Sequence, residues 1–212
     1  MGRHLVPLTV DNLAGLPARC RDCAFWEHAP GSADQSAPAG RPGAGKEAWV
    51  STVLREWGTC GRLVQVDGRP VGFIMYAPPA YVPRSASFPT SPVTVDAVLL
   101  TTARIDPGYR GQGLGRVMVQ SMAKDLLARG VRAIEAFGDA RPDALSARLW
   151  DGGCLTPAPY LEAVGFEEVR AHAMFPRLRL ELKRAVSWRA DMEQALDRLF
   201  HAGLPRPALH PA

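Results

Sequence analysis

The chain has 212 residues, of which 47% are hydrophobic and 22% charged, and its formal net charge is +4. This composition excludes a collagen, a coiled coil and a wholly disordered chain, and no apolar run approaches the roughly 18 residues of a membrane span. Residues 1–7 lack the apolar segment of a signal peptide, so we expect a soluble cytoplasmic protein. No basic run is interleaved with aromatic residues, which argues against a nucleic-acid partner.

The N-terminal part of the chain combines short elements with a loop. Residues 3–10 are predicted to form a strand, and Asp11 is predicted to cap a short helix that runs to about Cys20. Residues 29–44 are small, polar and interrupted by proline, which is typical of a flexible loop. A helix is predicted over residues 46–57 and ends before a glycine.

The middle of the chain predicts a hairpin, a long strand and an amphipathic helix. Asp67-Gly68 between two apolar segments is a strong signal for a two-residue hairpin turn. A proline-rich connection leads to a predicted strand over residues 96–105, and a glycine-rich turn follows. Residues 114–129 are then predicted to form a helix with one buried face, because apolar residues recur at every fourth position.

The remaining elements are two strands and two helices. A strand is predicted over residues 131–136 and a short helix over residues 158–164. Residues 177–183 alternate between leucine and charged residues, so we expect a strand with the leucines inward and the charges outward. A last helix is predicted over residues 187–203. The order of elements predicts an α/β fold with a mixed sheet and helices on both faces.

The most specific motif is the glycine-rich segment 110–116, Arg-Gly-Gln-Gly-Leu-Gly-Arg, between a strand and a helix. Glycines let the backbone approach a ligand, and a helix N-terminus offers unpaired N–H groups, so a phosphate fits. The plain alternative is a turn that only begins a packed helix. The dinucleotide fingerprint does not fit, because Gly115 comes one position early, and the P-loop-like residues 40–46 are not followed by Ser or Thr.

Two motifs carry a resemblance to a known family. After the lead-in residues 105–109, the positions Arg110, Gly113 and Gly115 resemble the acetyl-CoA loop of the GNAT N-acetyltransferase superfamily. Residues 160–166, Tyr-Leu-Glu-Ala-Val-Gly-Phe, are similar to the late helix-to-strand motif of that fold. The predicted order of elements also agrees with the family.

The resemblance implies a single GNAT domain over residues 1–212, with its core at about residues 3–184. The loop at 29–44 lies inside this domain, and the helix at 187–203 is an addition to it. More narrowly, residues 20–27, Cys-Arg-Asp-Cys-Ala-Phe-Trp-Glu, resemble a signature of an actinobacterial subgroup of the family.

The resemblance implies transfer of an acetyl group from acetyl-CoA to a primary amine by direct attack. In the family the strand before the loop pairs with pantetheine, a backbone N–H near its end binds the oxyanion, and the loop binds pyrophosphate. The residues implied to bind the cofactor are Ala103, Arg104, Ile105, Arg110, Gly111, Gln112, Gly113, Leu114, Gly115 and Arg116. The alternative is a catalytically degenerate acyl-CoA-binding or regulatory module of the same fold.

The implied partner is an amine acceptor, either a small molecule or a protein. No nucleic acid, membrane or metal ion is expected in the complex, and a homodimer is compatible with the family. Acetyl-CoA is the expected cosubstrate.

The resemblance also implies the catalytic residues. Glu135 follows the phosphate helix on a strand where several GNAT enzymes carry a glutamate, so it is the candidate base; the alternative is a carboxylate paired with arginine. Tyr160 is the candidate acid for the leaving thiolate. The family's tyrosine position falls on Leu161, and a shift of one residue turns a helical side chain by about 100°, so the alternative for Tyr160 is a core residue.

The four cysteines are predicted to be reduced thiols, as is usual in a cytoplasmic protein. A zinc site built from Cys20, Cys23, His28 and Cys60 lacks the spacing of a zinc knuckle, so no metal is expected. Cys154 has a second interpretation, in which it faces the thioester end of the cleft as a catalytic thiol.

Overall fold

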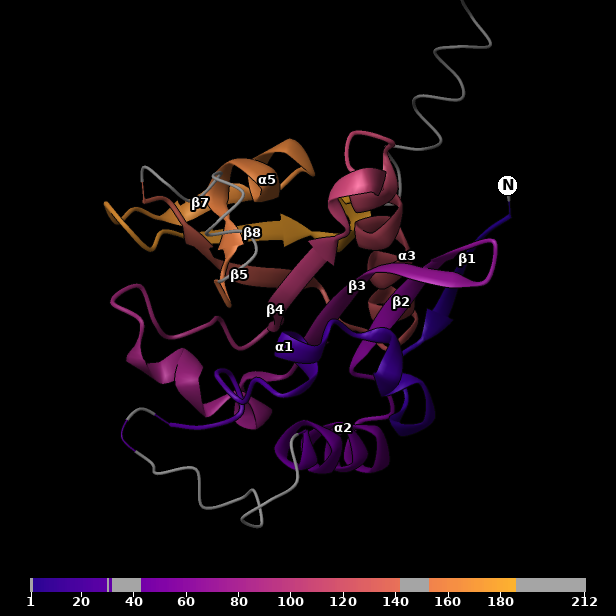
Figure 1. Cartoon of the computed structure of the whole chain (residues 1–212). Helices are drawn as coiled ribbons and strands as arrows, with labels where there is room; N and C mark the ends of the chain where they lie inside the picture. Colours follow the sequence, from indigo (N-terminus) through magenta and orange to yellow (C-terminus); the bar gives the residue numbers. More distant parts are fainter. Residues whose placement is uncertain (1, 30, 32–42, 142–152, 186–212) are drawn as a thin grey trace, which may run out of the picture.

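The computed structural model describes residues 2–29, 31, 43–141 and 153–185 (Figure 1). The predicted helix over residues 187–203 and most of the predicted loop over 29–44 lie outside these residues. None of the helices in the described part of the chain has the length and hydropathy of a membrane span.

One mixed sheet forms the centre of the molecule, with the strand order β1-β2-β3-β4-β5-β8-β7 and β6 paired to β5. The β4–β5 and β5–β6 pairs are parallel, and the other pairs are antiparallel. The strands are β1 (Arg3–Pro7), β2 (Gly61–Val66), β3 (Arg69–Ala77), β4 (Ala97–Ile105), β5 (Ala133–Asp139), β6 (Thr156–Pro157), β7 (Glu167–Arg170) and β8 (Arg177–Glu181).

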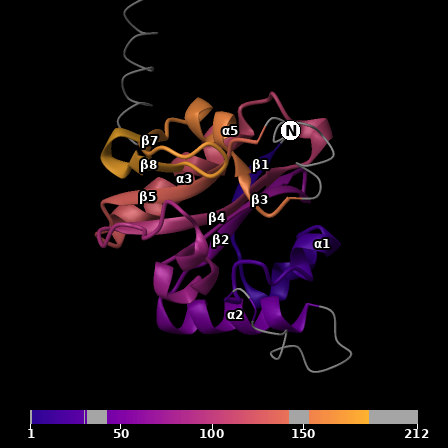
Figure 2. The same ribbon diagram turned by 90° about the vertical axis from the view of Figure 1, so that its left-hand side faces the viewer.

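Helices cover both faces of this sheet (Figure 2). One face packs against α3 and α5, and the other against α1 and α2, with a buried apolar cluster on each side. Because successive strand residues point to opposite faces, β3 contributes Ile74 to the first cluster and Phe73 to the second. The helices are α1 (Ala18–Arg21), α2 (Ala44–Glu56), α3 (Leu114–Ala128), α5 (Ala158–Ala163) and the 3-10 helices η1 (Val10–Gly15), η2 (Pro79–Tyr81), η3 (Pro83–Ser87) and η4 (Pro107–Tyr109).

The predicted α/β fold with a mixed sheet is confirmed, and so is the hairpin. Asp67 and Gly68 have φ angles of 49° and 79°, and a two-residue turn of this type needs positive φ at both positions. The turn joins β2 to β3, which hydrogen-bond along their length. The predicted helix over residues 46–57 is found as α2.

The prediction for the segment after β1 was wrong. Asp11 does not cap a helix but lies inside η1, and Thr9 is the N-cap residue, with its backbone N–H donating to Asn12 Oδ1 at 2.9 Å. The expected single helix is divided in two, because Pro17 stands at the start of α1 and has no N–H to continue a helical hydrogen-bond series.

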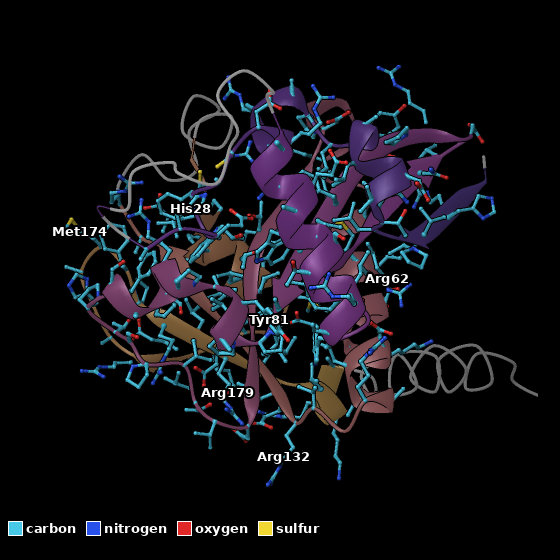
Figure 3. All side chains as sticks on the ribbon, turned by 90° about the horizontal axis from the view of Figure 1, so that it is seen from below. His28, Arg62, Tyr81, Arg132, Met174 and Arg179 are labelled. Atoms are coloured by element: carbon cyan, nitrogen blue, oxygen red, sulfur yellow. The ribbon has the colours of Figure 1, made fainter. Side chains whose placement is uncertain are left out.

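The prediction that the charged residues of 177–183 face outward holds for Glu181 and Lys183, which are exposed, but was wrong for the two arginines. Arg177 is only 8% exposed, and the side chain of Arg179, which is labelled in Figure 3, is 16% exposed. Both arginines form ion pairs with Glu135 of the neighbouring strand β5. The alternation of leucine and arginine therefore separates an apolar core from a buried ion-pair network rather than from solvent.

Candidate functional site

Strands β4 and β5 run side by side over a short distance and then separate. Their paired residues end at Leu99 and Glu135. Beyond this point β6 lies beside β5, through the pair Gly138 and Thr156, and Thr156 Oγ1 accepts the backbone N–H of Ala103 at 3.3 Å. The carboxyl ends of parallel strands are the usual ligand-binding edge of an α/β sheet, so this separation marks the candidate site.

The glycine-rich loop follows β4 and begins α3. Gly111 has a φ of 74°, and Gly113, the N-cap residue of α3, has a φ of 79°. A Cβ at either position would meet no atom within 4 Å, so both glycines are required by conformation and face open space. The first N–H groups of α3 lack intrahelical partners and carry the positive end of the helix dipole. These residues fit a phosphate group.

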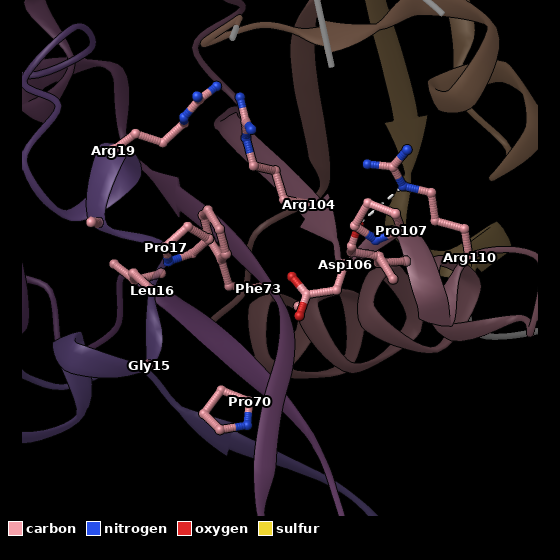
Figure 4. Close-up of a pocket in the computed structure, with 13 residues that line it drawn as sticks. Gly15, Leu16, Pro17, Arg19, Pro70, Phe73, Arg104, Asp106, Pro107 and Arg110 are labelled. Atoms are coloured by element: carbon pink, nitrogen blue, oxygen red, sulfur yellow. Dashed lines mark hydrogen bonds between the residues drawn. The ribbon is translucent and has the colours of Figure 1, made fainter. Parts of the chain in front are cut away.

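Arginines flank this loop on both sides. Arg110 Nε donates to the carbonyl of Ile105 at 3.1 Å, which holds the loop against the end of β4 (Figure 4). Arg116 Nη2 donates to the carbonyl of Ala163 at 3.4 Å and so joins the first turn of α3 to the end of α5. A phosphate at the loop would therefore lie near guanidinium groups that can form charge-assisted hydrogen bonds.

Tyr160 of α5 packs against the same turn of α3. A Cβ at Gly115 would lie 2.7 Å from the Tyr160 hydroxyl oxygen, so only glycine allows this contact. Burial raises the pKa of Tyr160, which keeps the phenol protonated. Leu161, at the family's tyrosine position, is fully buried in the apolar core. The structure thus brings Tyr160 to the glycine-rich loop and not to the opposite face of the sheet.

Two cavities lie on the face of the sheet that packs against α1 and α2. The larger has a volume of about 570 Å³, and Figure 4 shows Arg19 and Arg104 extending toward one another at one end of it. Phe73 and Asp106 also line this cavity. The smaller cavity, of about 210 Å³, shares Arg19, Phe73 and Arg104 with the larger. We call this pair of cavities the acceptor-side cavities, after the role that we propose for them below.

Two cysteines far apart in sequence meet at the smaller cavity. Cys23 Sγ and Cys154 Sγ are 3.3 Å apart, and both thiols line the cavity wall together with Cys20. Cys60 is instead fully buried, with its thiol toward the carbonyl of Leu8. In the described part of the chain no group of three or more His, Cys, Asp or Glu residues has the arrangement of a metal site.

Glu135 lies inside the protein and not on a cavity wall. Its carboxylate has no exposed surface and forms ion pairs with Arg179 at 3.2 Å and Arg177 at 3.5 Å. Thr94 donates to it twice, from its hydroxyl at 2.6 Å and from its backbone N–H at 3.2 Å. Neither acceptor-side cavity includes Glu135 among its lining residues. This placement favours the alternative of a carboxylate paired with arginine.

The structure also shows lining residues that sequence reasoning had not assigned to the site. Arg104 was expected to act through its backbone, but its side chain reaches the acceptor-side cavities and donates to the carbonyl of Gly153. Asp106, Arg19 and Phe73 had no assigned role. Because successive residues of β4 point to opposite faces of the sheet, the sequence could have placed the Arg104 side chain on the face away from the buried Ala103. The position of Arg19 at the cavities depends on tertiary packing, which has no local signal.

An open mixed sheet that separates at β4 and β5, with a glycine-rich loop at the start of α3, is typical of an acetyltransferase fold. Residues 29–150 match the Acetyltransferase (GNAT) family, and the chain belongs to that family. The GNAT resemblance predicted from two motifs is therefore confirmed at the family level. A search of curated proteins gives no match.

Solved structures with low sequence identity share the fold. The ribosomal-protein-alanine N-acetyltransferase of Brucella melitensis is 16% identical, with 84% of this chain and 99% of that chain covered and a TM-score of 0.53. An N-acetyltransferase of Staphylococcus aureus Mu50 is 16% identical over 86% and 99% of the two chains, with a TM-score of 0.51. The protein yncA of Salmonella typhimurium, solved with its cofactor acetyl-CoA, is 13% identical over 86% and 95%, with a TM-score of 0.51.

Proposed function

We propose that this protein transfers the acetyl group of acetyl-CoA to a primary amine by direct attack of the amine on the thioester. The observation that carries the proposal is the loop at Gly111 and Gly113, which has positive φ angles, faces open space and begins α3 directly after β4. Acetyl-CoA supplies an activated acyl group, and the protein has to hold it, expose it to the amine and manage the protons.

The cofactor contacts follow from the backbone. The N–H groups of residues 110–116 would hold the pyrophosphate, and the backbone of residues 103–105 would pair with the pantetheine. An N–H near Ile105 would stabilise the oxyanion that forms during attack. In this structure the Ala103 N–H donates to Thr156 Oγ1, so its use by the pantetheine requires that this bond be exchanged.

The two proton transfers of the reaction take place on opposite faces of the sheet. Asp106 is the carboxylate among the described residues on the wall of the larger cavity, and we propose that it accepts the proton of the incoming ammonium group. The protonated phenol of Tyr160, at the cofactor loop, has the form that an acid for the leaving thiolate needs. Glu135, the base implied by the family resemblance, contributes instead to stability.

The acceptor side is cationic, because Arg19 and Arg104 line its cavities, against the single carboxylate of Asp106 among the described lining residues. Lys46 also lines the smaller cavity, but its charge is compensated by an ion pair with Glu27. An acceptor with an anionic group near its amine fits this surface better than a polyamine does. The acceptor is a small molecule or a protein that presents such an amine. Cys20 and Cys23 of the motif at 20–27 line the smaller of these cavities, which supports a role of this motif in selecting the acceptor.

The test is release of free thiol from acetyl-CoA in the presence of a panel of amines, with binding of CoA measured separately by thermal shift. Binding with turnover supports the proposal. Binding without turnover for any amine would identify the degenerate acyl-CoA-binding module, which the burial of Glu135 and the shifted Tyr160 favour. No increase in melting temperature at millimolar CoA would contradict both functions.

A further inference from the structure

The two thiols at the smaller cavity are held by contacts that do not involve each other. Cys23 Sγ accepts the backbone N–H of Phe25 at 3.4 Å, just after α1. The carbonyl of Cys154 accepts the indole N–H of Trp26 at 3.0 Å, and Trp26 is only 3% exposed. These anchors place two sulfur atoms 3.3 Å apart although 131 positions separate them in sequence.

The surroundings make the two thiols unequal. When Cys23 is ionised, the Cys154 thiol and the Phe25 N–H donate to its sulfur and Lys46 lies nearby, so the pKa of the Cys23 thiol is lowered. The pKa of Cys154 is raised, because it hydrogen-bonds to Cys23 and is partly buried. Cys23 therefore has the character of an attacking thiolate, and Cys154 that of a resolving thiol.

We propose that Cys23 and Cys154 form a thiol–disulfide exchange site that accepts an anionic low-molecular-weight disulfide. The ligand class follows from the cavity, whose wall includes the side chains of Arg19 and Arg104. Lys46 also lies on this wall, but its charge is compensated by a buried ion pair with Glu27. No Asp or Glu is among the described residues that line this smaller cavity. A negatively charged disulfide is therefore attracted to the site, and a positively charged one is repelled.

The exchange takes place in two balanced steps. The Cys23 thiolate attacks one sulfur of the small disulfide, whose S–S bond breaks; a mixed disulfide forms, and the other half leaves as a thiolate. The sulfur of Cys154 then attacks that of Cys23, and the second half leaves as a thiol with the Cys154 proton. The two protein thiols lose two electrons, and the small disulfide gains them. The sulfur atoms have to approach from 3.3 Å to about 2.05 Å.

Oxidation at this site would restrain β6. Cys154 lies two residues before Thr156, which occupies the N–H of Ala103 at the separation of β4 and β5. A disulfide between Cys154 and Cys23 would hold the segment around Thr156 in place. The proposed pantetheine contact instead requires Thr156 to release the N–H of Ala103. This consequence, unlike the exchange itself, rests on the proposed acetyl transfer, and we expect the oxidised protein to transfer acetyl groups several-fold more slowly.

The experiment compares two disulfides of similar size and opposite charge, 3,3′-dithiodipropionate and cystamine, each with the reduced full chain. Their rates are normalised to their rates with free glutathione. We expect 3,3′-dithiodipropionate to consume two of the four thiols, to give a non-reduced peptide that links Cys23 to Cys154, and to react at least about fivefold faster than cystamine after normalisation. Equal normalised rates would overturn the assigned ligand class.

Variants define the partners. Cys154→Ser should stop at a mixed disulfide on Cys23, and Cys20→Ser is the matched control, because Cys20 lines the same cavity and should not be needed. A peptide that links any other cysteine pair, or none at all, would overturn the site. Peptide mapping needs no enzymatic activity. A linked peptide in a protein that is inactive both oxidised and reduced would therefore contradict the proposed function and leave the exchange site standing.

Discussion

The cofactor loop and the acceptor-side cavities are built in opposite ways. The loop consists of neighbouring residues, 105–116, between a strand and the helix that follows it. The acceptor-side cavities gather residues from η1, α1, α2, β3, β4 and the segment before β6, and the larger cavity also includes Asp106, Pro107 and Arg110 at the start of the loop. A site made of one segment has a sequence motif, whereas a site made of many segments has only a geometry.

The two regions also bind charge by different means. The loop offers backbone N–H groups at a helix N-terminus, which no side-chain substitution removes unless it alters the backbone. The acceptor side offers the guanidinium groups of Arg19 and Arg104, which a single substitution can remove one at a time. Substitutions in the loop should therefore affect the cofactor strongly, and those on the acceptor side should affect the second substrate moderately.

The largest effect is expected for Gly113→Val. A β-branched residue at a φ of 79° is strained by about 1–3 kcal/mol, and its side chain would enter the space where we place the pyrophosphate. We expect the affinity for acetyl-CoA, measured by isothermal titration calorimetry, to fall at least about a hundredfold, since charge-assisted hydrogen bonds contribute about 1.5–3 kcal/mol each.

Gly130→Val is the matched control for this substitution. Gly130 has a φ of 77°, would also meet no atom within 4 Å, and stands just beyond the opposite end of α3. It should lower the melting temperature by a similar amount and leave acetyl-CoA affinity unchanged. Equal losses of affinity in both variants would show that strain, and not the position of the cofactor, explains the result.

Glu135→Gln separates the base implied by the family from a structural carboxylate. Removing its charge leaves Arg177 and Arg179 buried with less compensation, so the free energy of unfolding in urea should fall by about 3 kcal/mol. Glu181→Gln is the control, because Glu181 pairs with the same Arg179 but its side chain is 48% exposed, and it should cost less than about 1 kcal/mol. A large loss of kcat with unchanged stability would restore Glu135 as the base.

The sequence was sufficient for the fold and for the position of the glycine-rich loop before α3, because both depend on local signals. The hairpin at Asp67-Gly68, the buried face of α3 and the glycine spacing at 111–115 each depend on residues close together in the chain. The meeting of Cys23 with Cys154 does not, because it depends on how β6 inserts beside β5. The same limit applies to Glu135, whose burial depends on arginines from β8.

Arg104→Gln tests the charge of the acceptor side. With β-alanine as acceptor, the loss of one guanidinium group should raise the KM about tenfold, which corresponds to about 1.4 kcal/mol. Propylamine, which has a similar length but no carboxylate, should show nearly the same KM in both proteins, and so should acetyl-CoA. A parallel increase for β-alanine and propylamine would mean that Arg104 shapes the cavity through its contact with Gly153 and does not bind an anion.

The smallest effect concerns the pH at which Cys23 reacts. Hydrogen bonds from Cys154 and from the N–H of Phe25, with the charge of Lys46, lower its pKa to about 6, against the opposing effects of burial and of Glu27. A lowered pKa means that the thiolate forms earlier as pH rises. Alkylation by iodoacetamide at Cys23, followed by peptide mass spectrometry, should therefore rise between pH 5 and 7 and then level off.

Cys154→Ala removes the largest of these effects on the Cys23 pKa and should move the rise in alkylation to higher pH. Cys20 in the same protein is the internal control, because burial raises its pKa and its alkylation should increase only well above neutral pH. A Cys23 profile that coincides with that of Cys20 would show that the two sulfur atoms do not share a hydrogen bond in solution, and the contrast between a preorganised thiol pair and ordinary buried thiols would be lost.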